Sequence, residues 1–254
     1  MDIVDAQVHA NMLGTEVTLA IMDALGVQGV LFDEYQRTDG DGAAQPGYQL
    51  ADGTFRPIGP NAESAALRHP ERFAFLMRVD PRDPGIEGWI ETLATTPGFK
   101  ALRTIVLTQA DAAVFGDGGS DRLLKAARAH SLPLFVTCPG RMLLLEVCAK
   151  RFPDVQFVID HCGAAFDAPR GKATIDDAIT MARYPNVAYK WARIQPDRIQ
   201  TRCRDDGAWA QASRQANRSR LRDWSVPDER SYRLSESGVH VVLQRNTGHP
   251  DRYR

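Results

Sequence analysis

Residues 132–163 read LPLFVTCPGRMLLLEVCAKRFPDVQFVIDHCG, and this stretch decides the fold class. Two apolar runs, 132–137 and 155–159, flank a helical pattern at 141–152. Strands that are almost continuously apolar are typical of a parallel sheet with both faces covered. The segment therefore predicts a strand–helix–strand unit of an α/β protein.

The same alternation extends through the first three quarters of the chain. Strands are expected at 3–9, 28–32, 72–79, 99–107, 132–137, 155–159 and 187–191. Helices are expected at 15–25, 62–69, 84–94, 121–130, 141–152 and 172–183, and 39–60 reads as a Gly/Pro-rich loop. This pattern fits a doubly wound open sheet or an eight-stranded barrel. No glycine-rich phosphate-binding turn follows the first strand, so a TIM-like (β/α)8 barrel is preferred, incomplete if the eighth strand is missing.

The composition changes near residue 192. Residues 193–254 carry 13 arginines, no lysine and 8 acidic residues, a net charge of +5, whereas the preceding residues carry a net −6. Such a shift marks a domain boundary, a poorly folded tail or an unrelated sequence register. We therefore expect a barrel over 1–192 and an atypical Arg-rich segment over 193–254. In that segment only 239–243 resembles a strand that could close the barrel.

Charge and hydropathy exclude several classes of protein. The 254 residues are 43% hydrophobic and carry a formal net charge of −1, which predicts neither nucleic-acid nor membrane binding. No apolar run approaches the roughly 18 residues that span a bilayer, and MDIVDAQVHA does not resemble a signal peptide. The four cysteines form no CxxC pair. A cytoplasmic protein with reduced thiols is expected, and the sequence leaves its oligomeric state open.

Polar side chains gather where the expected strands end. In barrels of this kind the functional site forms at the carboxyl ends of the strands. Two imidazoles, two arginines and a lysine that converge on one opening suit an anionic small molecule with a carbonyl group. The candidate residues in chain order are Gln7, His9, Arg78, Arg103, Cys138, His161 and Lys190. Asp160 is expected to face the helical layer instead.

Several of these segments resemble one known family. Residues 4–9 (VDAQVH) resemble the Asp-x-His-x-His first strand of the amidohydrolase superfamily, in its amidohydrolase-2 branch. Residues 22–27 (MDALGV), 157–163 (FVIDHCG) and 186–190 (NVAYK) are similar to further segments of that branch. The resemblance covers about residues 1–192 and does not extend to the tail. It implies a TIM-like barrel that hydrolyses lactones or amides, or that decarboxylates aromatic acids.

The chain departs from the pattern of that branch at three positions. Gln7 replaces the first histidine of strand one, and the strand at 132–137 ends without the histidine that metal-dependent members place there. No Gly-Ser-Asp segment, which carries the general base in the family, follows Lys190. A catalytic zinc needs three imidazole, thiolate or carboxylate ligands, so no metal cofactor is expected. If zinc or manganese were bound, Gln7, His9 and His161 would be its ligands.

These features favour a lactonase-like hydrolase that acts on a carboxylated ring. His9 and His161, with Gln7, are the expected catalytic residues, which would orient and polarise the carbonyl group. Arg103 and Arg78, with Lys190 and Cys138, are the expected substrate-binding residues. A metal-dependent decarboxylase or amidohydrolase of the same fold is the first alternative. The second is a catalytically impaired barrel remnant, because the eighth-strand aspartate is missing.

Overall fold

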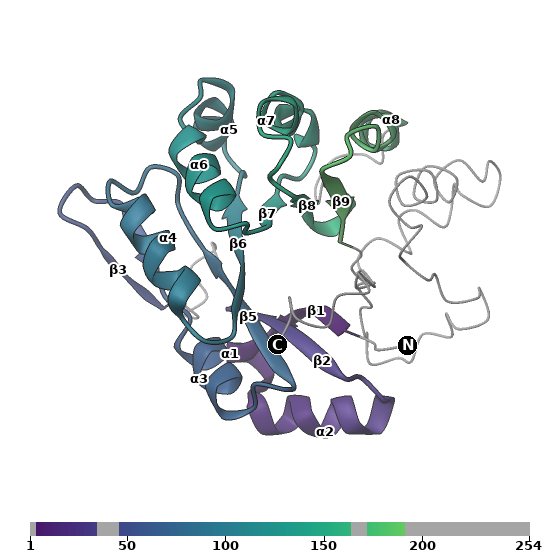
Figure 1. Ribbon diagram of the computed structural model, residues 1–254. Helices are drawn as coiled ribbons and strands as arrows, with labels where there is room; N and C mark the ends of the chain where they lie inside the picture. The colour runs from purple at the N-terminus through teal and green to yellow at the C-terminus, as the bar shows by residue number, and fades with distance from the viewer. Residues whose placement is uncertain (1–3, 35–45, 164–171, 191–254) are drawn as a thin grey trace.

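Seven parallel strands curl into an incomplete barrel in the computed structural model, which describes residues 4–34, 46–163 and 172–190 (Figure 1). Their order in the sheet is β1-β2-β5-β6-β7-β8-β9, and every neighbouring pair is parallel. The seven strands are β1 (Val4–His9), β2 (Gly29–Asp33), β5 (Phe73–Arg78), β6 (Phe99–Ile105), β7 (Leu134–Thr137), β8 (Phe157–Ile159) and β9 (Val187–Tyr189). The expected parallel α/β barrel fold is confirmed.

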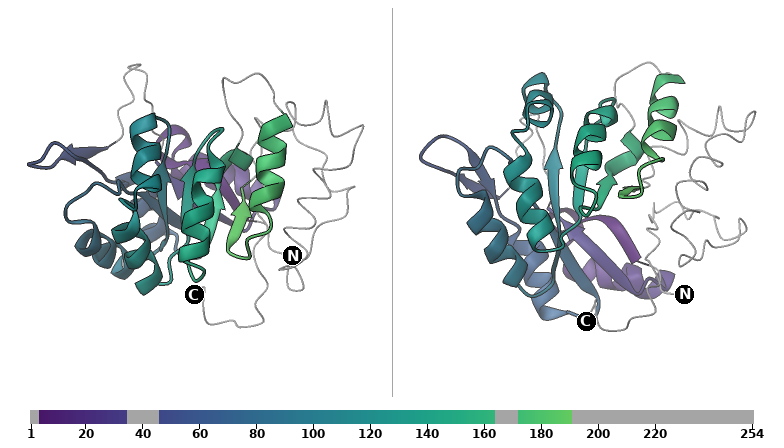
Figure 2. Two further views of the ribbon diagram at one scale, coloured as in Figure 1. Left: turned by 90° about the horizontal axis from the view of Figure 1, so that it is seen from above. Right: turned by 45° about the horizontal axis from the view of Figure 1, so that its top comes forward.

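The helices cover the convex face of this sheet (Figures 1 and 2). They are α1 (Ala10–Leu13), α2 (Thr15–Leu25), α3 (Pro60–Arg68), α4 (Ile86–Thr95), α5 (Gln109–Gly116), α6 (Asp121–Ala129), α7 (Leu145–Arg151) and α8 (Lys172–Met181). A 3-10 turn, η1 (Met142–Leu144), precedes α7, and a second, η2 (Asp160–Gly163), follows β8. Gly26 ends α2 in the left-handed conformation (φ 69°), as glycine after a helix commonly does. None of the helices in the described ranges is long and apolar enough to cross a membrane.

Four short elements differ from the sequence-based expectation. The loop expected at 39–60 contains a two-stranded antiparallel hairpin, β3 (Gly47–Gln49) and β4 (Phe55–Pro57). Helices α1 and α5 were also not expected. Each of these elements has eight residues or fewer, which is too short for a hydrophobic period to be recognised. The expected boundary at 192/193 and the candidate strand at 239–243 lie outside the described residues.

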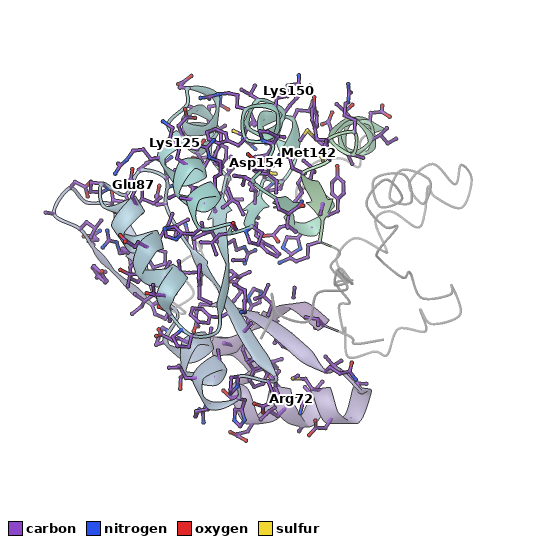
Figure 3. All side chains as sticks on the ribbon, in the orientation of Figure 1. Arg72, Glu87, Lys125, Met142, Lys150 and Asp154 are labelled. Atoms are coloured by element: carbon purple, nitrogen blue, oxygen red, sulfur yellow. The ribbon has the colours of Figure 1, made fainter. Side chains whose placement is uncertain are left out.

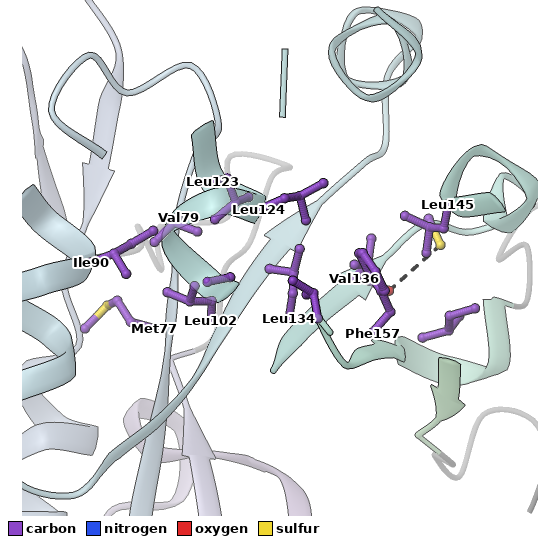
Figure 4. Close-up of a cluster of buried hydrophobic side chains, with 14 of the residues drawn as sticks. Met77, Val79, Ile90, Leu102, Leu123, Leu124, Leu134, Val136, Leu145 and Phe157 are labelled. Atoms are coloured by element: carbon purple, nitrogen blue, oxygen red, sulfur yellow. Dashed lines mark hydrogen bonds between the residues drawn. The ribbon is translucent and has the colours of Figure 1, made fainter. Parts of the chain in front are cut away.

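The main hydrophobic core lies between the sheet and the helices. Strand residues such as Leu102, Val136 and Phe157 pack there against helical residues such as Ile90 and Leu124, as Figure 4 shows. Charged side chains such as Glu87 of α4 and Lys150 of α7 lie on the outer surface (Figure 3). This segregation explains why the strands read as apolar: one of their faces is completely covered by helices.

Candidate active site

A second hydrophobic cluster lies on the concave face of the sheet, and every one of its members comes from a strand. We call it the interior floor, and it consists of Leu31, Leu76, Ala101, Phe135 and Val158. Since side chains of a strand return to the same face every second residue, the residue two positions further on must also face the interior. In all five strands the residue two positions after the floor residue is polar.

Together with two further strand ends they form what we call the polar ring. Each of the seven strands contributes one residue at or near its carboxyl end, and β1 and β9 contribute through His9 and Lys190. The complete ring is His9, Asp33, Arg78, Arg103, Thr137, Asp160 and Lys190. In the sheet register His9 lies opposite Asp33, and Arg78 lies opposite Arg103. The site is therefore a layer of polar and charged side chains above an apolar floor.

Arg103 is the centre of an ion network within the ring. Its Nη1 contacts the carboxylate of Asp33, and its Nε donates to Oδ2 of Asp160 at 2.8 Å. The hydroxyl of Thr137 accepts from Nη2 of Arg103 at 3.1 Å and donates to the same Asp160 oxygen at 2.6 Å. Burial alone would raise the pKa of Asp160, but Arg103 and Lys190 hold it well below its usual range. The guanidinium of Arg103 is thus engaged by two carboxylates of the protein itself.

Lys190 is completely buried beneath the mouth of the ring. Its Nζ lies 2.7 Å from Oδ1 of Asp160, donates to the backbone carbonyl of Ala6 at 3.3 Å, and lies 5.3 Å from the centre of the Phe135 ring. Burial lowers the pKa of this ammonium group, while Asp160 opposes the shift. The ammonium group of Lys190 therefore contacts other groups of the protein and is not exposed to a substrate.

His9 is held in its neutral form beside this network. Its Nδ1 lies 3.6 Å from Oδ2 of Asp33, and its side chain is 21% exposed. Burial, followed by the positive charges of Arg103 and Lys190, lowers its pKa to about 3. His161 also contributes to this shift, so the two imidazoles are close enough to interact electrostatically. A neutral imidazole keeps one N–H that can donate to a carbonyl oxygen.

His161 has an unusual backbone conformation. Its φ of 53° lies in the left-handed region, which is uncommon for residues other than glycine and is frequent at functional sites. The turn η2 continues to Gly163, whose φ is 68° and where an added Cβ would lie 2.3 Å from Cε of Met142. The positive φ therefore favours glycine at 163, and the chain leaves the direction of β8 at His161.

Asp160 corrects one sequence-based expectation. It was expected to face the helical layer, but its side chain lies on the concave face of the sheet with Arg103 and Lys190. The reason is that Val158 belongs to the interior floor, so alternation places Asp160 on the same face. Because the chain then turns at His161, the side chain of that residue does not follow the alternation of β8.

Arg78 lines a small hollow at the carboxyl ends of β5 and β6. The hollow is also lined by Asp80, Arg82 and Asp111. Arg82 forms ion pairs with Asp80 at 3.3 Å and with Asp111 at 2.7 Å. Burial lowers the pKa of Arg78 to about 10, while Asp80 and Asp111 oppose the shift. Arg78 therefore stays protonated at neutral pH at the rim of the site.

The remaining candidates are placed differently. Cys138 packs in the core between the sheet and the helices, where burial, with a smaller effect of Asp160, raises the pKa of its thiol to about 12. The structure does not bring this side chain into the ring. Gln7 lies in β1, but its side chain is outside the described part of the structure.

Sequence reasoning assigned no catalytic or binding role to three residues that belong to the ring, Asp33, Thr137 and Asp160. All three stand at strand ends, and the signal that identifies them is their period of two from the floor residues.

The described donor set does not fit a divalent metal. The part of the chain that the structure describes contains no group of three His, Cys, Asp or Glu side chains arranged to hold a metal ion. His9 and His161 offer two imidazole nitrogen donors, and the nearby Asp33 and Asp160 are engaged by Arg103.

Fold and site together define an α/β barrel protein with a polar site at the carboxyl ends of its strands. The sequence profile of the amidohydrolase family matches residues 4–229. The chain therefore belongs to the amidohydrolase family, and the match extends into the Arg-rich segment, past the motifs that suggested the relationship. No curated protein matches the chain significantly.

Solved amidohydrolase structures share the fold at low sequence identity. An amidohydrolase from Burkholderia multivorans with bound HEPES is 14% identical, with a TM-score of 0.59 over 85% of this chain and 80% of that chain. A zinc-bound structure of an amidohydrolase from Burkholderia multivorans has a TM-score of 0.57, with the same identity and coverage. Amidohydrolase 2 from Bifidobacterium longum subsp. infantis is 11% identical, with a TM-score of 0.52 over 85% of this chain and 80% of that chain.

Proposed function

We propose that this protein is a hydrolase that acts on a lactone or a related ring carrying a carboxylate group. The observation that carries the proposal is the polar ring at the strand ends, in which His9 lies beside Asp33 and Arg103 while His161 stands in the turn after β8. The fixed positive charge of Arg103 lies next to His9, because both contact Asp33. Such a preorganised electrostatic environment stabilises the negative charge that develops on a carbonyl oxygen during hydrolysis.

In this proposal each candidate residue has a separate role. Neutral His9 donates a hydrogen bond to the carbonyl oxygen, and His161 orients the ring from the other side. Arg78, at the rim, binds the substrate carboxylate, while Arg103 and Lys190 supply fixed charge. Water adds to the carbonyl carbon and the ring C–O bond breaks, which yields a carboxylic acid and a hydroxyl group. The partner in this proposal is a small molecule.

A panel of lactones tests the proposal. The purified protein is assayed against 2-pyrone and γ-lactone rings with and without carboxylate groups. His9→Ala and His161→Ala are each expected to lower kcat/KM about 100-fold or more, because each removes a group that stabilises transition-state charge. His130→Ala, at an exposed helix end, is the control. Unchanged activity in both site variants would overturn the assignment.

Binding of the substrate carboxylate is tested separately at Arg78. Arg78→Met is expected to raise KM about 10-fold for carboxylated lactones and to leave uncharged lactones unaffected, because a charge-assisted hydrogen bond is lost. The variant Lys125→Met, on the outer surface of α6, is the control. An equal effect on both classes of lactone contradicts the role of Arg78.

The metal-dependent decarboxylase or amidohydrolase remains the alternative, and zinc in the Burkholderia multivorans structure is the reason to test it. Elemental analysis and chelation distinguish the two proposals. Full activity after dialysis against a chelator supports the proposed hydrolase. One tightly bound equivalent of zinc or manganese, with activity lost on its removal, supports the alternative. A folded protein without metal and without activity on lactones, amides or aromatic acids points to the barrel remnant.

A further inference from the structure

The two imidazoles of the site belong to opposite sides of an open sheet. His9 ends β1, which is one outer strand of the seven, and His161 follows β8, which lies next to the other outer strand, β9. Measured through the hydrogen-bonded sheet, β1 and β8 are separated by four other strands. Small changes in twist at each strand pair would add up over this distance. A direct connection across the opening would fix the two imidazoles more firmly.

Lys190 makes such a connection. Its Nζ contacts Asp160, the residue directly before His161, at 2.7 Å, and donates to the carbonyl of Ala6, three residues before His9, at 3.3 Å. Both contacts are buried, because Lys190 is 1% exposed and Asp160 is 1% exposed. The backbone N–H of Lys190 also donates to the carbonyl of Ile159 at 2.9 Å. One side chain therefore joins β1 to the end of β8.

We infer that Lys190, together with Asp160, is a positioning pair that sets the separation of His9 and His161. The inference rests on the proposed function for the catalytic role of the two histidines. The contacts of Lys190 are independent of the proposed function. Lysine suits this task because its long stem crosses the gap and its ammonium group has three donors. Asp160 is held in place by Arg103 and Thr137, so the strand end that carries His161 is itself rigid. Lys190 contacts the protein and not the substrate, so its role beyond supplying fixed charge is to position the histidines.

The test removes the pair without leaving a lone buried charge. Lys190→Met leaves Asp160 with one cation fewer and can fail to fold, because an unpaired buried charge is strongly destabilising. The double variant Lys190→Met/Asp160→Asn removes both charges at once, and replacement of both partners is often tolerated. We expect it to fold, to lose about 10- to 100-fold in kcat, and to keep KM within about threefold, as displaced catalytic groups do.

Two measurements that need no substrate separate positioning from plain stability. The ring 15N shifts of both His9 and His161 are expected to change in the double variant, because the strand ends that carry the two rings shift when the connection is lost. Amide hydrogen exchange in β1 is expected to accelerate about 10-fold or more while α6 keeps its protection. Unmoved histidine shifts, or equal acceleration in β1 and α6, would overturn the inference. If the shifts move but no lactone is hydrolysed, the positioning role stands and the proposed function fails.

The exposed pair Lys150 and Glu146 supplies a matched control. Its nitrogen–oxygen distance is 2.9 Å, close to that of the buried pair, but it lies on one exposed helix face. Lys150→Met/Glu146→Gln is expected to leave the histidine shifts, the exchange pattern and kcat unchanged. A response in this control as large as in the buried pair would mean that loss of any lysine–carboxylate pair has the same effect, and would also overturn the inference.

Discussion

The interior floor and the polar ring differ by only two residues along each strand, yet they follow different physical rules. Floor residues such as Leu76 and Phe135 are stabilised by removal of apolar surface from water, which requires volume but little orientation. Ring residues such as Arg103 and Asp160 have lost their hydration, and only well-oriented hydrogen-bond and ion-pair partners compensate for this loss. The comparison teaches that the floor supports the site, whereas the charges above it define its chemistry.

The largest effect is expected from a cavity in the floor. Phe135→Ala should lower the free energy of unfolding by about 3–5 kcal/mol, because a buried ring is removed and its space is not refilled. Phe55→Ala, on the exposed hairpin strand β4, is the control and should cost much less. Chemical denaturation measures both values. A loss below about 1 kcal/mol for Phe135→Ala would show that the floor is not a packed layer.

The next effect is the pH dependence that the ring imposes through His9. The pKa of His9 is about 3 in the folded protein, whereas a solvent-exposed histidine has a pKa of 6.5. The unfolded chain therefore binds more protons than the folded chain between these pH values. The free energy of unfolding therefore falls as the pH is lowered from about 6.5 towards 3, by at most about 1.4 kcal/mol per pH unit for this one proton.

His9→Asn checks that contribution. Thermal unfolding between pH 4 and pH 7 is expected to show a flatter slope for this variant than for the wild type. His130→Asn, at an exposed helix end, should keep the wild-type slope. Equal slopes for all three proteins would contradict a neutral, buried His9 and would weaken the contrast between ring and floor.

The smallest effect is expected at the hydroxyl of Thr137. Thr137→Val keeps the shape of the side chain but removes the hydrogen bond to Asp160 and the bond accepted from Arg103, while Asp160 and Arg103 remain partners of each other. We expect a loss of about 1 kcal/mol, typical of one hydrogen bond. Ile159→Val, on the apolar face of the neighbouring strand, is a comparison of similar size that removes no polar contact. If Thr137→Val has no effect on stability, the ring is less strictly satisfied than its geometry indicates.

The sequence by itself determined the order of strands and helices and the parallel class of the sheet. Apolar runs of four to eight residues between helical periods carry that information, because a strand covered on both faces has no polar alternation. The sequence also located His9 and His161, since strand ends are recognisable wherever an apolar run stops at a polar residue. It did not reveal the hairpin of β3 and β4, whose strands are too short to show a period.

Only the tertiary structure decided how the charges are paired. Arg103 was expected to bind substrate, but in the folded chain it contacts Asp33 and Asp160, which stand 70 and 57 positions away in the numbering. Such pairs depend on the curvature of the sheet and on the stagger between strands, which no local pattern encodes. The sequence therefore determined where the strands end in polar residues, and the curvature of the sheet decided which of those residues neutralise one another.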